Sequence, residues 1–122
     1  MLAFAITQLV ATGIAHSYLG ERYIFIRLFK RGDLPKLSAG TEFTKGTLRF
    51  AWHLTTVAWW GLAYLAFTAG YGPVSKDQVR TVMGVTSLMS AAFPLYFTRG
   101  KHLSWIAFIA VGALLLASRR SP

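Results

Sequence analysis

The sequence contains no cysteine, and only four of its 122 residues are acidic. Without cysteine, the chain cannot form disulfides, thiolate metal sites, iron–sulfur clusters or a cysteine nucleophile. The acids Glu21, Asp33, Glu42 and Asp77 give no pair of carboxylates that can be placed together for acid–base catalysis. Glycine-rich phosphate loops and serine nucleophile elbows are also absent from the sequence. Acid–base chemistry would have to use the histidines with Glu21, so whether the protein is an enzyme stays open.

Charge of either sign is scarce, and hydrophobic residues are abundant. Only 14% of the residues are charged and 54% are hydrophobic, whereas soluble domains carry about 25% charged residues. The net charge of +9 comes from basic residues that cluster between apolar segments. This distribution is typical of the cytoplasmic loops of membrane proteins, and no basic face of a soluble fold is visible. We therefore expect the lipid bilayer, and no nucleic acid, as a partner.

Four apolar segments are near the length of a membrane-crossing helix, which takes about 20 residues. Transmembrane helices are predicted over about residues 2–20, 49–70, 77–98 and 102–118. The predicted fold is an all-α, integral membrane four-helix transmembrane bundle. Residues 1–122 are predicted to form a single transmembrane domain, because the chain is too short for two.

The connection between the first two predicted helices begins with RYIFIRLFKRG, which mixes aromatic and aliphatic residues with basic ones. This segment is too short to span a bilayer, but its basic residues can reach anionic headgroups while its rings enter the acyl boundary. An interfacial amphipathic helix is predicted over about residues 22–31. The following segment, SAGTEFTKG, is predicted to be a loop that ends at an N-cap, Thr44 or Thr47.

The basic residues favour one orientation in the membrane. The side that holds the first and third connections carries nine of the thirteen Lys and Arg residues, and the other side carries Lys76, Arg80, Arg119 and Arg120. Cytoplasmic loops carry the excess of Lys and Arg. The predicted location is the bacterial inner membrane, with multiple crossings and both termini outside the cytoplasm.

The three histidines are predicted to lie at one depth. His16 lies four residues before Gly20, at the cytoplasmic end of the first predicted helix, and His53 lies four residues after Arg49 in the second. At about 1.5 Å of rise per residue, each is about 6 Å inside its helix end. His102 begins the fourth helix, and Glu21 ends the first.

Helix periodicity predicts which side chains accompany the histidines in a ligand-binding site. Polar residues in a membrane helix turn toward protein rather than lipid. Two stripes fit this rule, one formed by Gln8, Thr12 and His16, and the other by His53, Thr56 and Trp60. The predicted ligand-binding residues are His16, His53, His102, Glu21, Thr12, Thr56 and Trp60.

Several chemistries fit such a layer. His16, His53 and His102 are candidate ligands of a divalent transition metal ion. Haem held by two histidines is a weaker candidate, because no glycine is well placed beside them for the ring. A histidine facing a polar cavity can also shuttle protons or bind a quinone or lipid headgroup. Alternatively, each histidine simply joins neighbouring helices through hydrogen bonds.

The segments HSYLGERYIF and RFAWHLTTVAWWG resemble those of a group of small, uncharacterised bacterial integral membrane proteins, which carry HSxLGE and WHLT motifs. The resemblance covers most of the chain and implies four crossings in a bacterial inner membrane. It implies no activity, cofactor or mechanism.

Two functions are therefore predicted from the sequence. The first is a small membrane protein with a cytoplasmic-side pocket of three histidines that binds a metal ion or small ligand. The second is a non-catalytic accessory or assembly subunit, whose small-residue and aromatic faces dock onto a larger membrane complex or a second copy of the chain.

Overall fold

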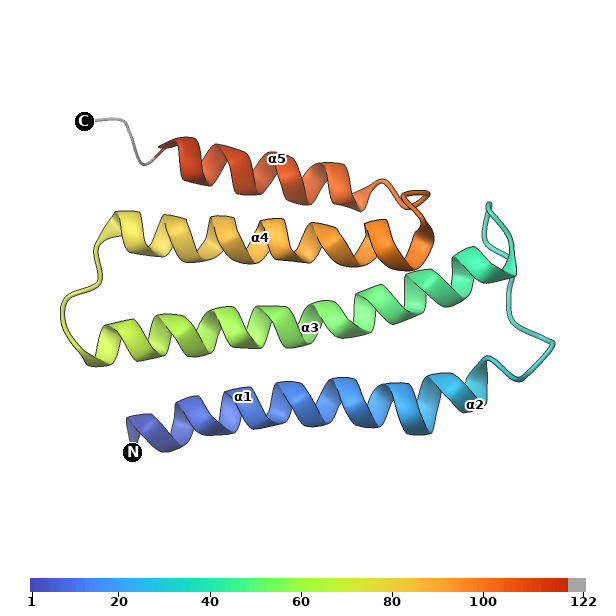
Figure 1. The fold of residues 1–122 in the computed structure, drawn as a ribbon, viewed down its shortest axis with the longest axis horizontal. Helices are drawn as coiled ribbons and strands as arrows, with labels where there is room; N and C mark the ends of the chain where they lie inside the picture. The colour runs from blue at the N-terminus through green and yellow to red at the C-terminus, as the bar shows by residue number, and fades with distance from the viewer. Residues whose placement is uncertain (119–122) are drawn as a thin grey trace.

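The structure, a computed structural model, describes residues 1–118, and the elements that it forms over that range are all helices. Four long antiparallel helical rods follow one another along the chain (Figure 1). The helices are α1 (Leu2–Leu19), the π-helix η1 (Gly20–Phe25), α2 (Ile26–Leu28), α3 (Thr41–Gly70), α4 (Lys76–Thr98) and α5 (Ser104–Ala117). The predicted number of long helices is confirmed. Arg119 and Arg120, which entered the predicted orientation, lie outside the described residues.

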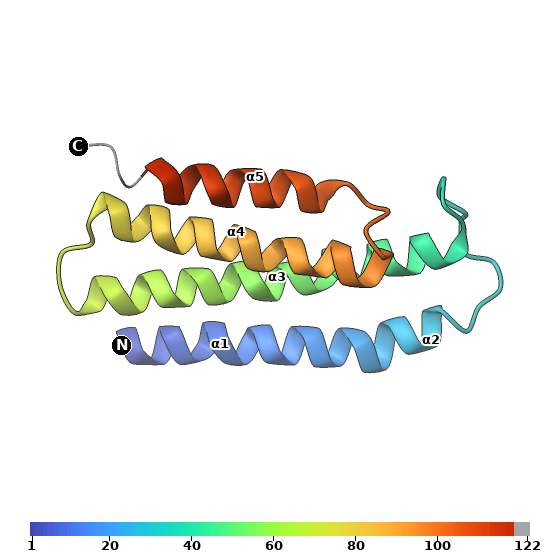
Figure 2. The same ribbon diagram turned by 45° about the horizontal axis from the view of Figure 1, so that its top comes forward.

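The four helical rods are arranged as an open row. Among the described elements, α1 packs only against α3, and α5 packs only against α4. Figures 1 and 2 show the same order, α1, α3, α4 and α5, from two directions. The accessible surface is 8149 Å², against about 6,500 Å² expected for a compact monomer of this mass. An open row, in which α1 and α5 do not contact each other, is consistent with this larger surface.

The predicted interfacial helix does not form a separate element. Residues 20–28 continue the axis of α1 as η1 and α2, so one helical rod runs from Leu2 to Leu28 (Figure 1). Phe25 is buried, and its ring meets the Trp52 ring of α3 edge-on at 5.5 Å. The cause is the packing of this segment against α3, which keeps it parallel to its neighbour instead of turning it along a surface.

Helix α3 begins at Thr41, eight residues before the predicted start at residue 49. Its N-cap is Gly40, with no side-chain cap, so neither Thr44 nor Thr47 acts as the predicted N-cap. Thr44 Oγ1 instead donates to the Pro35 carbonyl oxygen at 2.8 Å and accepts from the Leu37 backbone N–H at 3.1 Å. Thr44 therefore holds the α2–α3 connection against the first turn of α3 through hydrogen bonds.

Helix α4 begins with the capping box that the spacing of Ser75 and Gln78 indicates. The Gln78 backbone N–H donates to Ser75 Oγ at 3.1 Å, and the Ser75 backbone N–H donates to the Gln78 side chain at 2.8 Å. The helix ends at Thr98, and the backbone of its C-cap residue, Arg99, is left-handed, with φ 52° and ψ 42°.

Glycine stands at each contact between neighbouring helices. Gly13 and Gly20 lie against Trp60 and Trp52 at the α1–α3 contact. Gly46 lies against the Phe97 backbone, and Gly84 and Gly112 face each other between α4 and α5. Small residues allow helix backbones to approach closely, which is how helices associate in lipid, where burial of apolar surface gives no driving force.

Two stretches of the described chain, Leu2–Leu28 and Lys76–Thr98, are long and apolar enough to cross a membrane by length and composition. In the most apolar part of each stretch, 6% of the residues are buried in the first and 33% in the second. The core helix of a soluble protein is mostly buried. Helix α5 is apolar but has 14 residues, and α3 does not meet the same hydropathy criterion.

We predict that Gly46→Ala lowers the thermal stability of the protein. Alanine normally stabilises a helix by about 1 kcal/mol relative to glycine. At this position, however, the added Cβ would overlap the Phe97 carbonyl oxygen, a backbone atom that cannot rotate away. Overpacking costs about 1–3 kcal/mol, so the melting temperature in detergent should fall. Gly32→Ala is the control, because nothing lies within 4 Å of a Cβ there; equal melting of the two variants would contradict this packing.

Candidate ligand-binding site between α1 and α3

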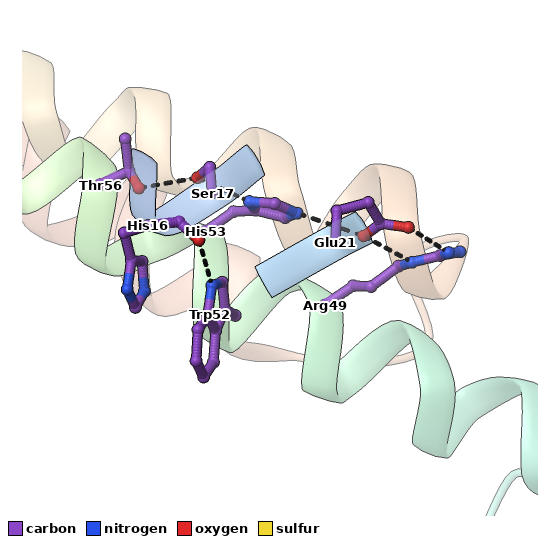
Figure 3. Close-up of polar contacts among 7 residues, drawn as sticks. All are labelled: His16, Ser17, Glu21, Arg49, Trp52, His53 and Thr56. Carbon is purple, nitrogen blue, oxygen red and sulfur yellow. Dashed lines mark hydrogen bonds and ion pairs between the residues drawn. The ribbon is translucent and has the colours of Figure 1, made fainter. Parts of the chain in front are cut away.

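A chain of hydrogen bonds joins α1 to α3 across their interface (Figure 3). His53 Nδ1 lies 2.8 Å from Ser17 Oγ, and Ser17 Oγ lies 2.7 Å from Thr56 Oγ1. Thr56 Oγ1 donates to the Gly13 carbonyl oxygen at 3.0 Å. We call Ser17, His53 and Thr56, together with Glu21 and Arg49, the interhelical polar network.

The direction of these hydrogen bonds follows from counting protons. Thr56 has one hydroxyl proton, which the Gly13 carbonyl accepts, so Thr56 Oγ1 accepts from Ser17. The Ser17 proton is then used, and Ser17 Oγ accepts from His53 Nδ1. His53 must therefore carry a proton on Nδ1. The lone pairs that remain on the serine and threonine oxygens can only accept.

Glu21 and Arg49 form the end of the network nearest the α2–α3 connection. The Arg49 guanidinium donates to both carboxylate oxygens of Glu21, with Nε 3.1 Å from Oε2 and Nη2 bonded to Oε1. His53 Nε2 lies 3.7 Å from Glu21 Oε2, within ion-pair range but longer than a hydrogen bond. A bidentate arginine–carboxylate pair fixes orientation as well as charge, so it aligns η1 with α3.

His16 belongs to an aromatic cluster beside the network, not to the network itself. Its ring stacks on Trp52 with centroids 4.3 Å apart and meets Trp59 edge-on at 5.0 Å. Trp52 Nε1 donates to the His16 carbonyl oxygen at 2.9 Å. Figure 3 shows the His16 ring lying beside Trp52 while the His53 ring extends toward Glu21.

His102 packs elsewhere. Its Nδ1 lies 2.9 Å from Ser104 Oγ at the start of α5, and its ring contacts Phe50 and Phe43 of α3. Thus the predicted layer of three histidines does not form a cluster. Within residues 1–118, no group of three or more His, Asp or Glu side chains is arranged to hold a metal ion, and the structure does not support the predicted metal site of His16, His53 and His102.

The predicted stripe on the first helix was offset by one residue. Gln8 and Thr12 are exposed, whereas Gly13 is buried and Ser17 and Glu21 contact α3. One residue corresponds to about 100° around a helix. On α3, the predicted stripe is correct in position, because His53 and Thr56 enter the network and Trp60 Nε1 points to the Val10 carbonyl oxygen at 3.4 Å.

A cleft of about 300 Å³ opens beside the network. Ser17, His53 and Thr56 are among its lining residues, but most of its lining surface is apolar. The apolar lining comes from three helices: Ile14, Tyr18, Val57, Trp60 and Phe93. A second cleft of about 320 Å³ between α3 and α4 shares Val57 and Trp60 with the first and extends to Tyr64 and Thr81. We call the two adjoining clefts the α3 groove.

Ser17 and Arg49 belong to the interhelical polar network, but the sequence prediction did not include them. Ser17 lies four residues before Glu21, and Arg49 lies four residues before His53, so each shares a helix face with a predicted residue. Periodicity alone could have found both. Arg49 was counted only as a loop cation because the second helix was predicted to begin there.

Comparison of the chain with protein-family models, with curated proteins and with solved structures gave no match. The resemblance to small bacterial membrane proteins therefore stays a prediction, and the site rests on its geometry alone.

We predict a measurable coupling between Glu21 and Arg49 in a double-mutant cycle with Glu21→Gln and Arg49→Gln. The side chains are about one-third exposed, so their coupling free energy should be about 1 kcal/mol, between the values of exposed and buried ion pairs. The control cycle uses Arg31 and Asp33, which are 64% and 66% exposed, and should give less than about 0.5 kcal/mol. Unfolding in mixed micelles measures both; equal coupling would contradict the assigned role of the pair.

Proposed function

We propose that the chain is a multi-pass membrane protein that binds a hydroxyl-bearing amphiphile from the bilayer. The hydroxyl binds at Ser17, His53 and Thr56, and the apolar tail lies in the α3 groove. The observation that carries this proposal is the cleft beside the network, where apolar side chains from three helices surround Ser17, His53 and Thr56.

Exposed apolar side chains along the open row support the membrane assignment. Large hydrophobic residues are exposed on every long helix, including Phe4, Leu62, Met89 and Leu114. Lipid covers such surfaces without any need for a closed bundle. The basic residues of the first and third connections lie at one end of the row, where the positive-inside rule predicts the cytoplasm.

The dimensions of the α3 groove support an elongated ligand. Each of its two clefts is at the small end of the volumes of ligand sites, about 300–1,000 Å³. From His53 to Tyr64 the groove follows about 16 Å of α3, a length that suits a chain of about a dozen carbons.

Hydrogen-bond capacity supports a donor as the head group. The hydroxyl protons of Ser17 and Thr56 are used within the network, so these oxygens offer lone pairs to the cleft. A ligand hydroxyl can donate to them, whereas an ether or a carbonyl cannot. The free lone pairs therefore favour a ligand that donates a hydrogen bond.

We predict that dodecanol carrying bromine at its tail quenches the tryptophan fluorescence of the purified protein, because Trp60 lines both clefts. The corresponding methyl ether should bind at least about fivefold more weakly, the equivalent of one hydrogen bond. Ser17→Ala should weaken binding of the alcohol by a similar factor and leave the ether unaffected.

Ser87→Ala is the matched control. Ser87 Oγ also donates to a backbone carbonyl between two helices, that of Phe108 at 2.9 Å, but it lies outside the α3 groove. Its removal should leave the alcohol's affinity unchanged. Equal binding of alcohol and ether, or equal effects of the two serine substitutions, would refute the proposed ligand chemistry.

We also predict the orientation by cysteine labelling, which the cysteine-free sequence makes unambiguous. An impermeant maleimide applied to intact bacteria should label Tyr71→Cys, in the α3–α4 turn, where the wild-type side chain is 80% exposed. It should label Lys36→Cys, in the α2–α3 connection, only after lysis. The reverse pattern would place the termini in the cytoplasm, and labelling of both sites in intact cells would argue against a membrane-spanning arrangement.

The open row also supports the second predicted function, an accessory subunit of a larger membrane complex or homo-oligomer. Helices α1 and α5 each have one neighbour in the row, which leaves their outer sides for lipid or for another protein. Crosslinking in native membranes distinguishes the two: a discrete larger species supports assembly, and a monomer that binds the alcohol supports the ligand site alone.

A further inference from the structure

A separate cleft of about 480 Å³ lies at the end of the row where α4 ends and α3 begins. Its lining combines basic and aromatic residues from both helices and from the α4–α5 turn: Glu42, Phe43, Arg49, Tyr96, Phe97, Thr98, Arg99 and Lys101. None of these residues lines the α3 groove. We call it the basic cleft.

The charges in the basic cleft do not cancel. Its single carboxylate, Glu42, is bonded to Lys45 Nζ at 2.7 Å. This hydrogen bond lowers the pKa of Glu42, and the charge of Lys45 compensates the negative charge of the carboxylate. Arg49 is paired with Glu21. Arg99 and Lys101 make no ion pair within residues 1–118, so they leave two uncompensated cations at the cleft.

Arg99 occupies a backbone conformation that favours glycine. Its φ of 52° lies in the left-handed region, and Gly100 follows with φ 75°. A side chain in this region costs about 1–2 kcal/mol, and helices commonly end with glycine at such a position. Strained residues concentrate at ligand sites. A ligand that binds the Arg99 guanidinium at this turn would explain why arginine stands here despite the conformational cost.

The basic cleft continues into an apolar one. A cleft of about 360 Å³, lined by Ala92, Phe93, Tyr96 and Phe97, shares Tyr96 and Phe97 with it. The two together present cations at the end of the row and aromatic rings along α4. A phospholipid has the same arrangement, with an anionic phosphate above apolar chains.

We infer that the basic cleft binds a phosphate group through Arg99 and Lys101. The group can belong to an anionic lipid headgroup or to a soluble phosphate ester, and the adjoining apolar cleft favours the lipid. This inference is independent of the hydroxyl-bearing ligand, which occupies the α3 groove.

The test uses the full chain in nanodiscs of phosphatidylcholine with a minority of phosphatidylglycerol. Native mass spectrometry after release into a neutral detergent counts the phosphatidylglycerol molecules retained by the protein. Lys101→Gln should reduce retention about fivefold, the effect of one cation near a lipid surface. Lys76→Gln is the matched control, because Lys76 is an exposed lysine at the opposite end of the row, and it should retain lipid as the wild type does.

Arg99→Gly separates loss of binding from loss of folding. Glycine adopts the left-handed backbone without strain, so the melting temperature should rise or stay constant while lipid retention falls about fivefold. Dialysis against radiolabelled inorganic phosphate forms the second arm. Phosphate bound by the wild type but not by Arg99→Gly, without lipid retention, assigns the cleft to a soluble phosphate ester.

Three results would overturn the inference. The first is that the wild type retains neither phosphatidylglycerol nor inorganic phosphate. The second is that Lys76→Gln loses as much binding as Lys101→Gln, which would indicate a non-specific effect of net charge. The third is that Arg99→Gly melts lower and retains the lipid, because the side chain would then serve the fold alone.

Discussion

The packing of α1 against α3 is the constraint on which the rest of the structure depends. Gly13 and Gly20 admit two tryptophan side chains, and the backbones come close enough for Thr56 to reach the Gly13 carbonyl. Leaving a buried polar group without a partner costs more free energy than a typical hydrogen bond contributes. The polar network is therefore satisfied as a unit, and it fixes the register of the first rod against the second.

This register also positions the clefts in which we propose that ligands bind. The row stays open because α1 packs only against α3 and α5 packs only against α4. The cleft beside the polar network is lined by residues of α1, α3 and α4. One cleft of the α3 groove lies between α1, α3 and α4, and the other lies between α3 and α4. The basic cleft has a different origin, since it forms where the α4–α5 turn meets the early start of α3.

The sequence predicted the four long helices and part of the polar network, and its errors have physical causes. Apolar runs identified the four long helices, and the spacing of His53 and Thr56 placed both on the face of α3 that meets α1. The predicted stripe on α1 failed because it followed the polar Thr12, whereas the contact follows Gly13. The three histidines were predicted to lie at one depth, but side chains at one depth meet only if they also point toward one another. The His16 ring stacks on Trp52, and the His102 ring lies against Phe50. The continuation of α1 through η1 depends on long-range contacts with α3, which no local pattern contains.

The most direct test of the α1–α3 network is the protonation state of His53, read by nitrogen-15 NMR of histidine-labelled protein with His53→Gln for assignment. The chain of donors that ends at the Gly13 carbonyl requires a proton on Nδ1. A proton-coupled Nδ1 resonance that loses its hydrogen-bond shift in Ser17→Ala is the predicted result. A bare Nδ1, or a spectrum unchanged by that substitution, would contradict the network.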